Sequence, residues 1–91
     1  MEVHVFLFEH RHGRDVTVHA SAELAYAVAA EIARRDWDEA RAFDATLPPT
    51  PPTQDVEAVE RYFAALEGIE SYEIKSCLVQ GPSPAPARSS A

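Results

Sequence analysis

The 91-residue chain has one cysteine, one lysine and only eight basic residues. A single cysteine excludes an intramolecular disulfide framework. Fifteen acidic residues give a formal net charge of −7, and phosphate binding requires clustered Lys and Arg, so we expect no nucleic-acid partner. No apolar run approaches the ~20 residues that span a bilayer, and we find no secretory signal at the start. We therefore expect a soluble, cytoplasmic protein that does not engage a membrane.

Motifs of common catalytic and cofactor sites are also missing. The three glycines are scattered, so there is no phosphate-binding loop. A dyad of Cys77 with a histidine is conceivable because thiolate chemistry needs a base nearby. A free cysteine in an apolar strand, however, usually behaves as a small hydrophobic residue. A small two-layer domain also offers little cavity volume for paired acid–base groups. We predict that the protein is not an enzyme and binds no cofactor.

What the chain does contain is a β-hairpin near its start, which carries all four histidines. Residues 2–10 are rich in β-formers, and residues 15–20 form a second short run of the same kind. His12 and Gly13 between them suit a two-residue turn, because Gly13 can adopt a positive φ. With these central turn residues, Phe6 faces His19 across the two strands.

This register predicts which side of the hairpin covers the core. We expect the core face to consist of Val3, Val5, Leu7, Val16, Val18 and Ala20. Two alternatives remain open. A three-residue loop would bring the phenylalanines opposite the second-strand valines, and a one-residue slip would exchange the faces.

The middle of the chain predicts two helices joined by a stiff connector. Ser21 is a suitable N-cap for a helix over residues 22–43, in which apolar residues recur at helical spacing. Residues 47–53 hold four prolines, which forbid a helix and favour an extended spacer. Asp55 is expected to cap a second helix, and Gly68 suits its C-terminal closure.

Residues 70–80 predict a third strand, with Tyr72, Ile74, Ser76 and Leu78 on one face. The resulting order, β-β-α-α-β, is that of an α+β two-layer sandwich. Because the apolar first strand needs a neighbour at each edge, we expect a three-stranded antiparallel or mixed sheet in the order 2-1-3, with both helices on one face. Residues 1–80 would form this single domain. Residues 81–91, rich in Pro, Ser and Ala, are predicted to be a disordered tail.

Two layers leave one sheet face open, and the predicted register assigns aromatic and histidine residues to it. Contiguous exposed apolar patches usually mark interaction sites, and a second copy related by a two-fold axis is the simplest partner. We therefore predict a small acidic protein-interaction module that forms a homodimer or higher homo-oligomer. The predicted anchors are Phe6, Phe8 and His19, with His4, His10 and Thr17 at the rim. Alternatively, the tail or the proline connector covers this face, or the register is slipped and the phenylalanines are core.

Three other functions are kept open. A heterologous protein could bind the open face. The acidic helices could occupy a basic surface of another protein and inhibit it, since residues 21–46 hold six acidic and three basic residues and residues 47–80 hold six and two. The histidines could bind a metal such as zinc, because His19 is expected to lie diagonal to His4 with a carboxylate nearby. His10 is expected opposite Asp15, where the two side chains could form a hydrogen-bonded pair. Their spacing matches no compact metal motif.

Overall fold

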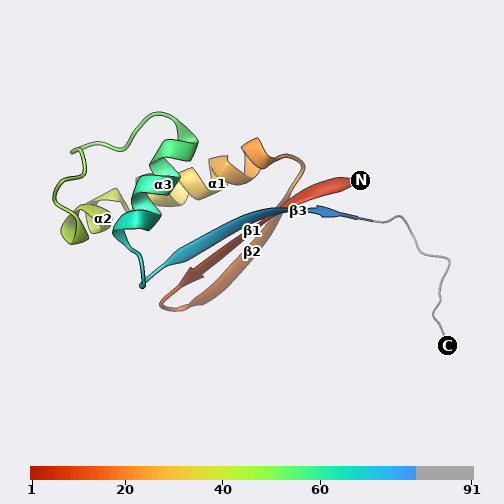
Figure 1. Cartoon of the computed structure of the whole chain (residues 1–91), viewed down its shortest axis with the longest axis horizontal. Helices are drawn as coiled ribbons and strands as arrows, with labels where there is room; N and C mark the ends of the chain where they lie inside the picture. The colour runs from red at the N-terminus through yellow and green to blue at the C-terminus, as the bar shows by residue number, and fades with distance from the viewer. Residues whose placement is uncertain (80–91) are drawn as a thin grey trace.

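The computed structural model describes residues 1–79, which form one sheet and three helices (Figure 1). The element order is β1 (Glu2–His10), β2 (Gly13–His19), α1 (Ala22–Arg35), α2 (Trp37–Phe43), α3 (Asp55–Ala65) and β3 (Ser71–Leu78). The predicted α+β class is confirmed. The tail predicted over residues 81–91 lies outside the described residues. Within the described part of the chain, no helix has the length and apolar character needed to cross a membrane.

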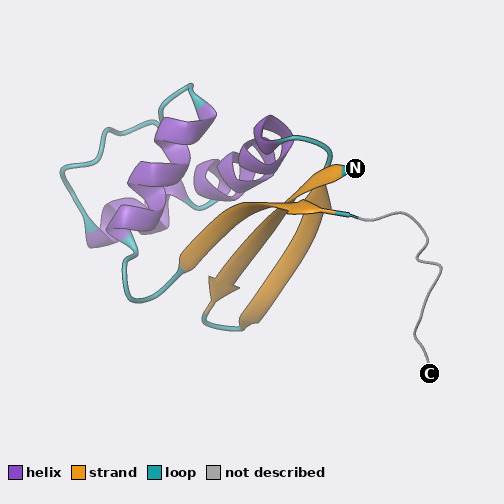
Figure 2. Ribbon diagram, turned by 45° about the vertical axis from the view of Figure 1, so that its right-hand side comes forward, coloured by secondary structure: helices purple, strands orange, loops and turns teal. Residues whose placement is uncertain are grey.

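The sheet has the predicted order, β2-β1-β3, and both of its pairings are antiparallel. β1 is therefore the central strand. The two ends of the described chain meet, since the Met1 amino group donates to the Val79 carbonyl oxygen at 3.1 Å. All three helices lie on the same side of the sheet, as the two ribbon views show (Figures 1 and 2). The other side of the sheet carries no layer from the described residues.

The helices cover the side of β1 that carries Phe6 and Phe8, which corrects the prediction that these rings are exposed. Their exposed fractions are only 2% and 6%. Phe8 meets Phe63 of α3 edge to face, with ring centroids 5.8 Å apart, and Phe63 lies 4.7 Å from Tyr72 of β3. Aromatic rings bury more apolar surface than valines do, so the helix layer forms over the phenylalanines.

The hairpin register also differs from the prediction. His10 pairs with Gly13, so Arg11 and His12 are the central turn residues, and Phe6 faces Thr17 instead of His19. Gly13 has a φ of +140°, which a residue with a side chain rarely adopts. The turn is held further by the His12 backbone N–H, which donates to Nδ1 of His10 at 3.2 Å. Each residue of β1 pairs with a β2 residue two positions before the predicted one. The same residues therefore share a face as predicted, but the helices cover the face of Phe6 and Phe8 and leave the valine face uncovered.

The predicted helix over residues 22–43 is two helices. Ser21 caps α1 as expected, its Oγ accepting the Leu24 N–H at 3.2 Å. The chain then turns at Asp36, whose φ and ψ of −108° and 23° are not helical. This turn directs Trp37 into the core, where it is 3% exposed and its indole N–H donates to the Pro48 carbonyl oxygen at 2.9 Å. A tertiary contact therefore decides where α1 ends.

The connector and α3 are held by side chains of α1 and by a buried polar pair. Arg34 donates to the Thr53 carbonyl oxygen at 2.8 Å and forms an ion pair with Asp55 at 2.9 Å. Asp55, which was predicted to be the N-cap, is instead the first residue of α3, and Gln54 occupies the N-cap position. After α3, the Tyr62 hydroxyl donates to Oε1 of the buried Glu70 at 2.8 Å. Burial, followed by this hydrogen bond, raises the pKa of Tyr62 above its ordinary value.

The assignment of faces predicts unequal effects for two substitutions in the hairpin. Phe6→Ala removes a buried ring and should lower the free energy of unfolding by about 3–5 kcal/mol. Val18→Ala, at a side chain that is 60% exposed, should lower it by less than about 1 kcal/mol. Urea unfolding of the isolated variants at a low protein concentration measures both. Equal losses in the two variants would contradict the assignment.

Candidate functional site

The uncovered side of the sheet, called the open sheet face below, is fixed by the strand register. Alternate residues of a strand point to opposite faces, and the residues paired with Leu7 are Val16 on β2 and Glu73 on β3. The same reasoning for the other rows gives the whole set. The open sheet face consists of Val3, Val5, Leu7, Glu9, Arg14, Val16, Val18, Ser71, Glu73, Lys75 and Cys77.

Most of the apolar surface on this face comes from β1 and β2. Val16 and Val18 are 53% and 60% exposed, and Val3, Val5 and Leu7 beside them are partly exposed. The alternation on β2 is therefore reversed: its valines point to solvent, while the intervening polar residues lie on the side of the helices. A strand of a two-layer sandwich normally has the opposite polarity. The reversal makes a contiguous apolar patch, of the kind that marks interaction sites.

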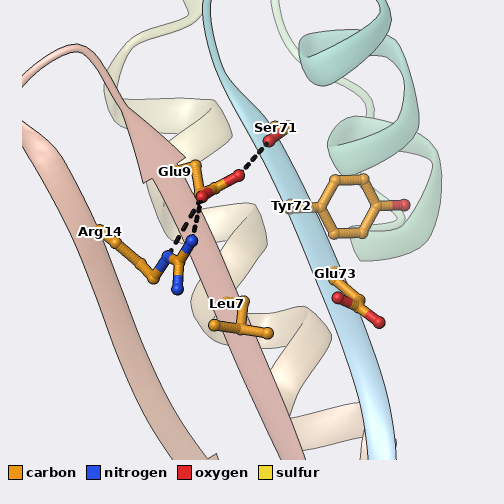
Figure 3. Close-up of a pocket in the computed structure, with 6 residues that line it drawn as sticks. All are labelled: Leu7, Glu9, Arg14, Ser71, Tyr72 and Glu73. Atoms are coloured by element: carbon orange, nitrogen blue, oxygen red, sulfur yellow. Dashed lines mark hydrogen bonds and ion pairs between the residues drawn. The ribbon is translucent and has the colours of Figure 1, made fainter.

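At the end of the open sheet face nearest the hairpin turn, charged groups replace the valines (Figure 3). Glu9 accepts two hydrogen bonds from Arg14, at 3.1 and 2.6 Å, and a longer one from the Ser71 hydroxyl at 3.4 Å. These groups, with Leu7 and Glu73, line a shallow hollow of about 270 Å³. The guanidinium of Arg14 lowers the pKa of Glu9 below its ordinary value. The pair stays charged near neutral pH and limits the patch on this side.

β3 contributes charge of both signs to the same face. Glu73 lies beside Leu7, and Lys75 lies beside Val5; both charged side chains are exposed. Cys77, the only cysteine, follows on the same face next to Val3 and is partly exposed. The open sheet face is thus an apolar area on β1 and β2 with an acid and a base in successive rows along β3.

The residues predicted to form the interface share one face, but it is the face that the helices cover. Phe6 and Phe8 are core residues, so neither is available as an anchor. His4 pairs directly with His19 across the strands, and Nε2 of His19 lies 2.7 Å from the Thr17 hydroxyl. His10 bonds to Asp15 at 3.0 Å, which confirms the predicted contact even though the register differs. The four predicted polar residues, His4, His10, Thr17 and His19, therefore lie on the partly exposed margin of the helix-covered face.

His10 lines a second cleft, of about 380 Å³, between the hairpin turn and the junction of α1 and α2. Its charged side chains are bound to one another: Arg11 pairs with Glu39, and Arg35 pairs with Asp36 at 2.8 Å. Nδ1 of His10 accepts the backbone N–H of His12, so the proton of the neutral ring is on Nε2 and is donated to Asp15. The ion pair of Arg11 with Glu39 therefore connects the hairpin turn to α2. Among residues 1–79, no three His, Cys, Asp or Glu side chains come together as a metal site.

The sequence did contain a signal for the correct open face. Tyr72 and Ile74 lie on one side of the third strand, and Glu73 and Lys75 lie on the other. The helix layer forms over the apolar side of β3, which is shared with Phe6 and Phe8. Comparing the two sides of the third strand would have assigned the open face to the valines of the hairpin.

No protein-family model, curated protein or solved structure matches the chain. The chemistry and geometry of the two surfaces described above are therefore the basis for assigning a function.

The pairing of Arg14 with Glu9 predicts a change in titration. Arg14→Gln should raise the pKa of Glu9 toward its ordinary value, because the neighbouring positive charge is lost. Since the Glu9 pKa is lowered in the folded state, its contribution to stability is present above the ordinary glutamate pKa and is lost as pH falls through the folded pKa. NMR titration of the side-chain carboxyl groups measures the change. Arg61→Gln, on α3, is the control and should leave the Glu9 titration where it is.

Proposed function

We propose that the protein is a protein-interaction module that forms a homodimer through its open sheet face. The observation that carries this proposal is the reversed polarity of β2, which exposes Val16 and Val18 beside the valines of β1. Burying one such side chain contributes on the order of 1.5–3 kcal/mol. The anchors are therefore different from the predicted phenylalanines, although the mode of association is the same.

A second copy is the partner that such a face most readily accepts. A two-fold interface uses the same surface on both chains, so apolar surface meets apolar surface without a specially matched partner. A domain of about 80 residues also buries a small core, and self-association adds to its stability. The patch and the small core therefore favour the same arrangement.

The size of the face limits the strength of the dimer. Three strands about 4.8 Å apart, of nine, seven and eight residues at about 3.3 Å each, give a flat area of about 400 Å² at most. Standard interfaces bury about 800 Å² per partner. We therefore expect a dimer that dissociates on dilution.

The ion-paired groups of the His10 cleft have structural partners, which favours a binding role for the protein over acid–base chemistry at that cleft.

Substituting the exposed valine tests the proposal. Val18→Asp puts a charge within the apolar patch and should weaken the dimer by at least about tenfold. Sedimentation velocity over a wide concentration series measures the dissociation constant, with circular dichroism to verify folding. Val18→Thr, which keeps the β-branched shape, should fold and show a smaller loss.

Val56→Asp is the matched control. Val56 is 45% exposed in the first turn of α3, on the side of the molecule away from the open sheet face, and an acidic residue is well tolerated there. The Val56→Asp variant should dimerise as the unmodified protein does. A protein that remains monomeric at every concentration, or one in which both Val→Asp variants weaken association equally, would contradict the proposal.

A further inference from the structure

We infer that the two copies meet about a two-fold axis that runs across the strands, so that Glu73 of each chain lies opposite the partner's Lys75. The inference rests on the proposed dimer and specifies its geometry. It is carried by the order of residues on the open sheet face, which the register fixes row by row.

Two neighbouring rows form the centre of the face. One row contains Val16, Leu7 and Glu73, from β2 to β3. The next row contains Val18, Val5 and Lys75 in the same order. The two rows lie about 7 Å apart along the strands, because residues of one face are two positions apart. Each row thus has two apolar residues and ends in one charge, and the two charges have opposite signs.

A two-fold axis across the strands, midway between these rows, makes the two rows complementary to each other. The rotation places each strand over the same strand of the partner, running in the opposite direction, and exchanges the two rows. Leu7 then faces the partner's Val5, and Val16 faces the partner's Val18. On β3, Glu73 faces the partner's Lys75, and the symmetry repeats each contact. Packed sheets about 10 Å apart with strands within about 30° of each other allow these contacts.

Other two-fold arrangements of the same face bring unfavourable groups together. An axis parallel to the strands places β2 over β3, so that Val16 faces the partner's Glu73 and removes it from water without a partner. An axis across the strands that passes through a row places Glu73 on the partner's Glu73, or Lys75 on the partner's Lys75. Like charges set opposite each other oppose a pairing. The charges on β3 therefore select one register out of these.

Reversing one charge in each of two variants tests the geometry. Glu73→Lys sets two lysine side chains opposite each other in its homodimer, and Lys75→Glu puts two acids together, so each homodimer should be at least about tenfold weaker. In a heterodimer of the two variants, each of the two symmetry-related contacts joins a lysine of the Glu73→Lys chain to an acid of the Lys75→Glu chain, so mixing the two variants should restore association. The chain that carries both substitutions likewise has an acid opposite a base at each contact of its homodimer. This double variant should therefore dimerise with an affinity near that of the unmodified protein.

The control uses Glu57→Lys, Arg61→Glu and the chain that carries both, which make the same charge changes on α3, where both side chains are exposed. None of these three variants should change the dissociation constant by more than about twofold. Sedimentation velocity measures every variant at the same ionic strength, with circular dichroism to verify folding. If the unmodified protein dimerises but the double substitution on β3 does not restore what each single substitution loses, the inferred geometry is wrong while the proposed dimer stands. If the unmodified protein never dimerises, both are wrong.

Discussion

The burial of Phe6 and Phe8 beneath the helices is the interaction on which the rest of the structure depends. Both rings are on the central strand, where Phe6 stacks on Phe8. Phe8 contacts Phe63 of α3, and Phe63 in turn contacts Tyr72 of β3. Because alternate side chains of a strand point to opposite faces, fixing Phe6 and Phe8 inward turns Val5 and Leu7 outward. A central strand that is apolar on both faces needs a layer on each side, and within the described residues the helices supply one layer only. The exposed side of β1 is therefore a consequence of how the core is built.

The edge strands show how this exposed side differs from an ordinary solvated surface. β2 sends Val16 and Val18 outward, which a two-layer domain with a solvated outer face would not require. β3 sends Glu73 and Lys75 outward, as a solvated face would. Departures from local sequence rules tend to occur where a surface has a function. The reversed strand and the alternating charges together make a face that is apolar at its centre and carries a self-complementary charge pattern at one edge.

Much of the fold could be predicted from the sequence, because it depends on local patterns: the strands, the Ser21 cap, the sheet order and the two sides of the third strand are as expected. The face that the helices cover was not predicted correctly, because both sides of the first strand are apolar and the alternation of residues cannot rank phenylalanine against valine. The hairpin register was displaced by two residues, since several turns suit the residues between the strands. The end of α1 was missed because it depends on the contact of Trp37 with Pro48, which is distant in the sequence. As a result, the predicted interface was placed on the face that the helices cover, and its anchors Phe6 and Phe8 are core residues.

The central claim is that the valine face of the hairpin packs on itself. The most direct test is an isotope-filtered NOE experiment on a mixture of labelled and unlabelled protein at a concentration where the dimer forms, because it detects only contacts between chains. We predict cross-peaks from the methyl groups of Val16 to those of the partner's Val18, and from Leu7 to the partner's Val5, consistent with the exposure of these valines. Contacts between chains that involve only helix residues, or none on the open sheet face, would contradict the account.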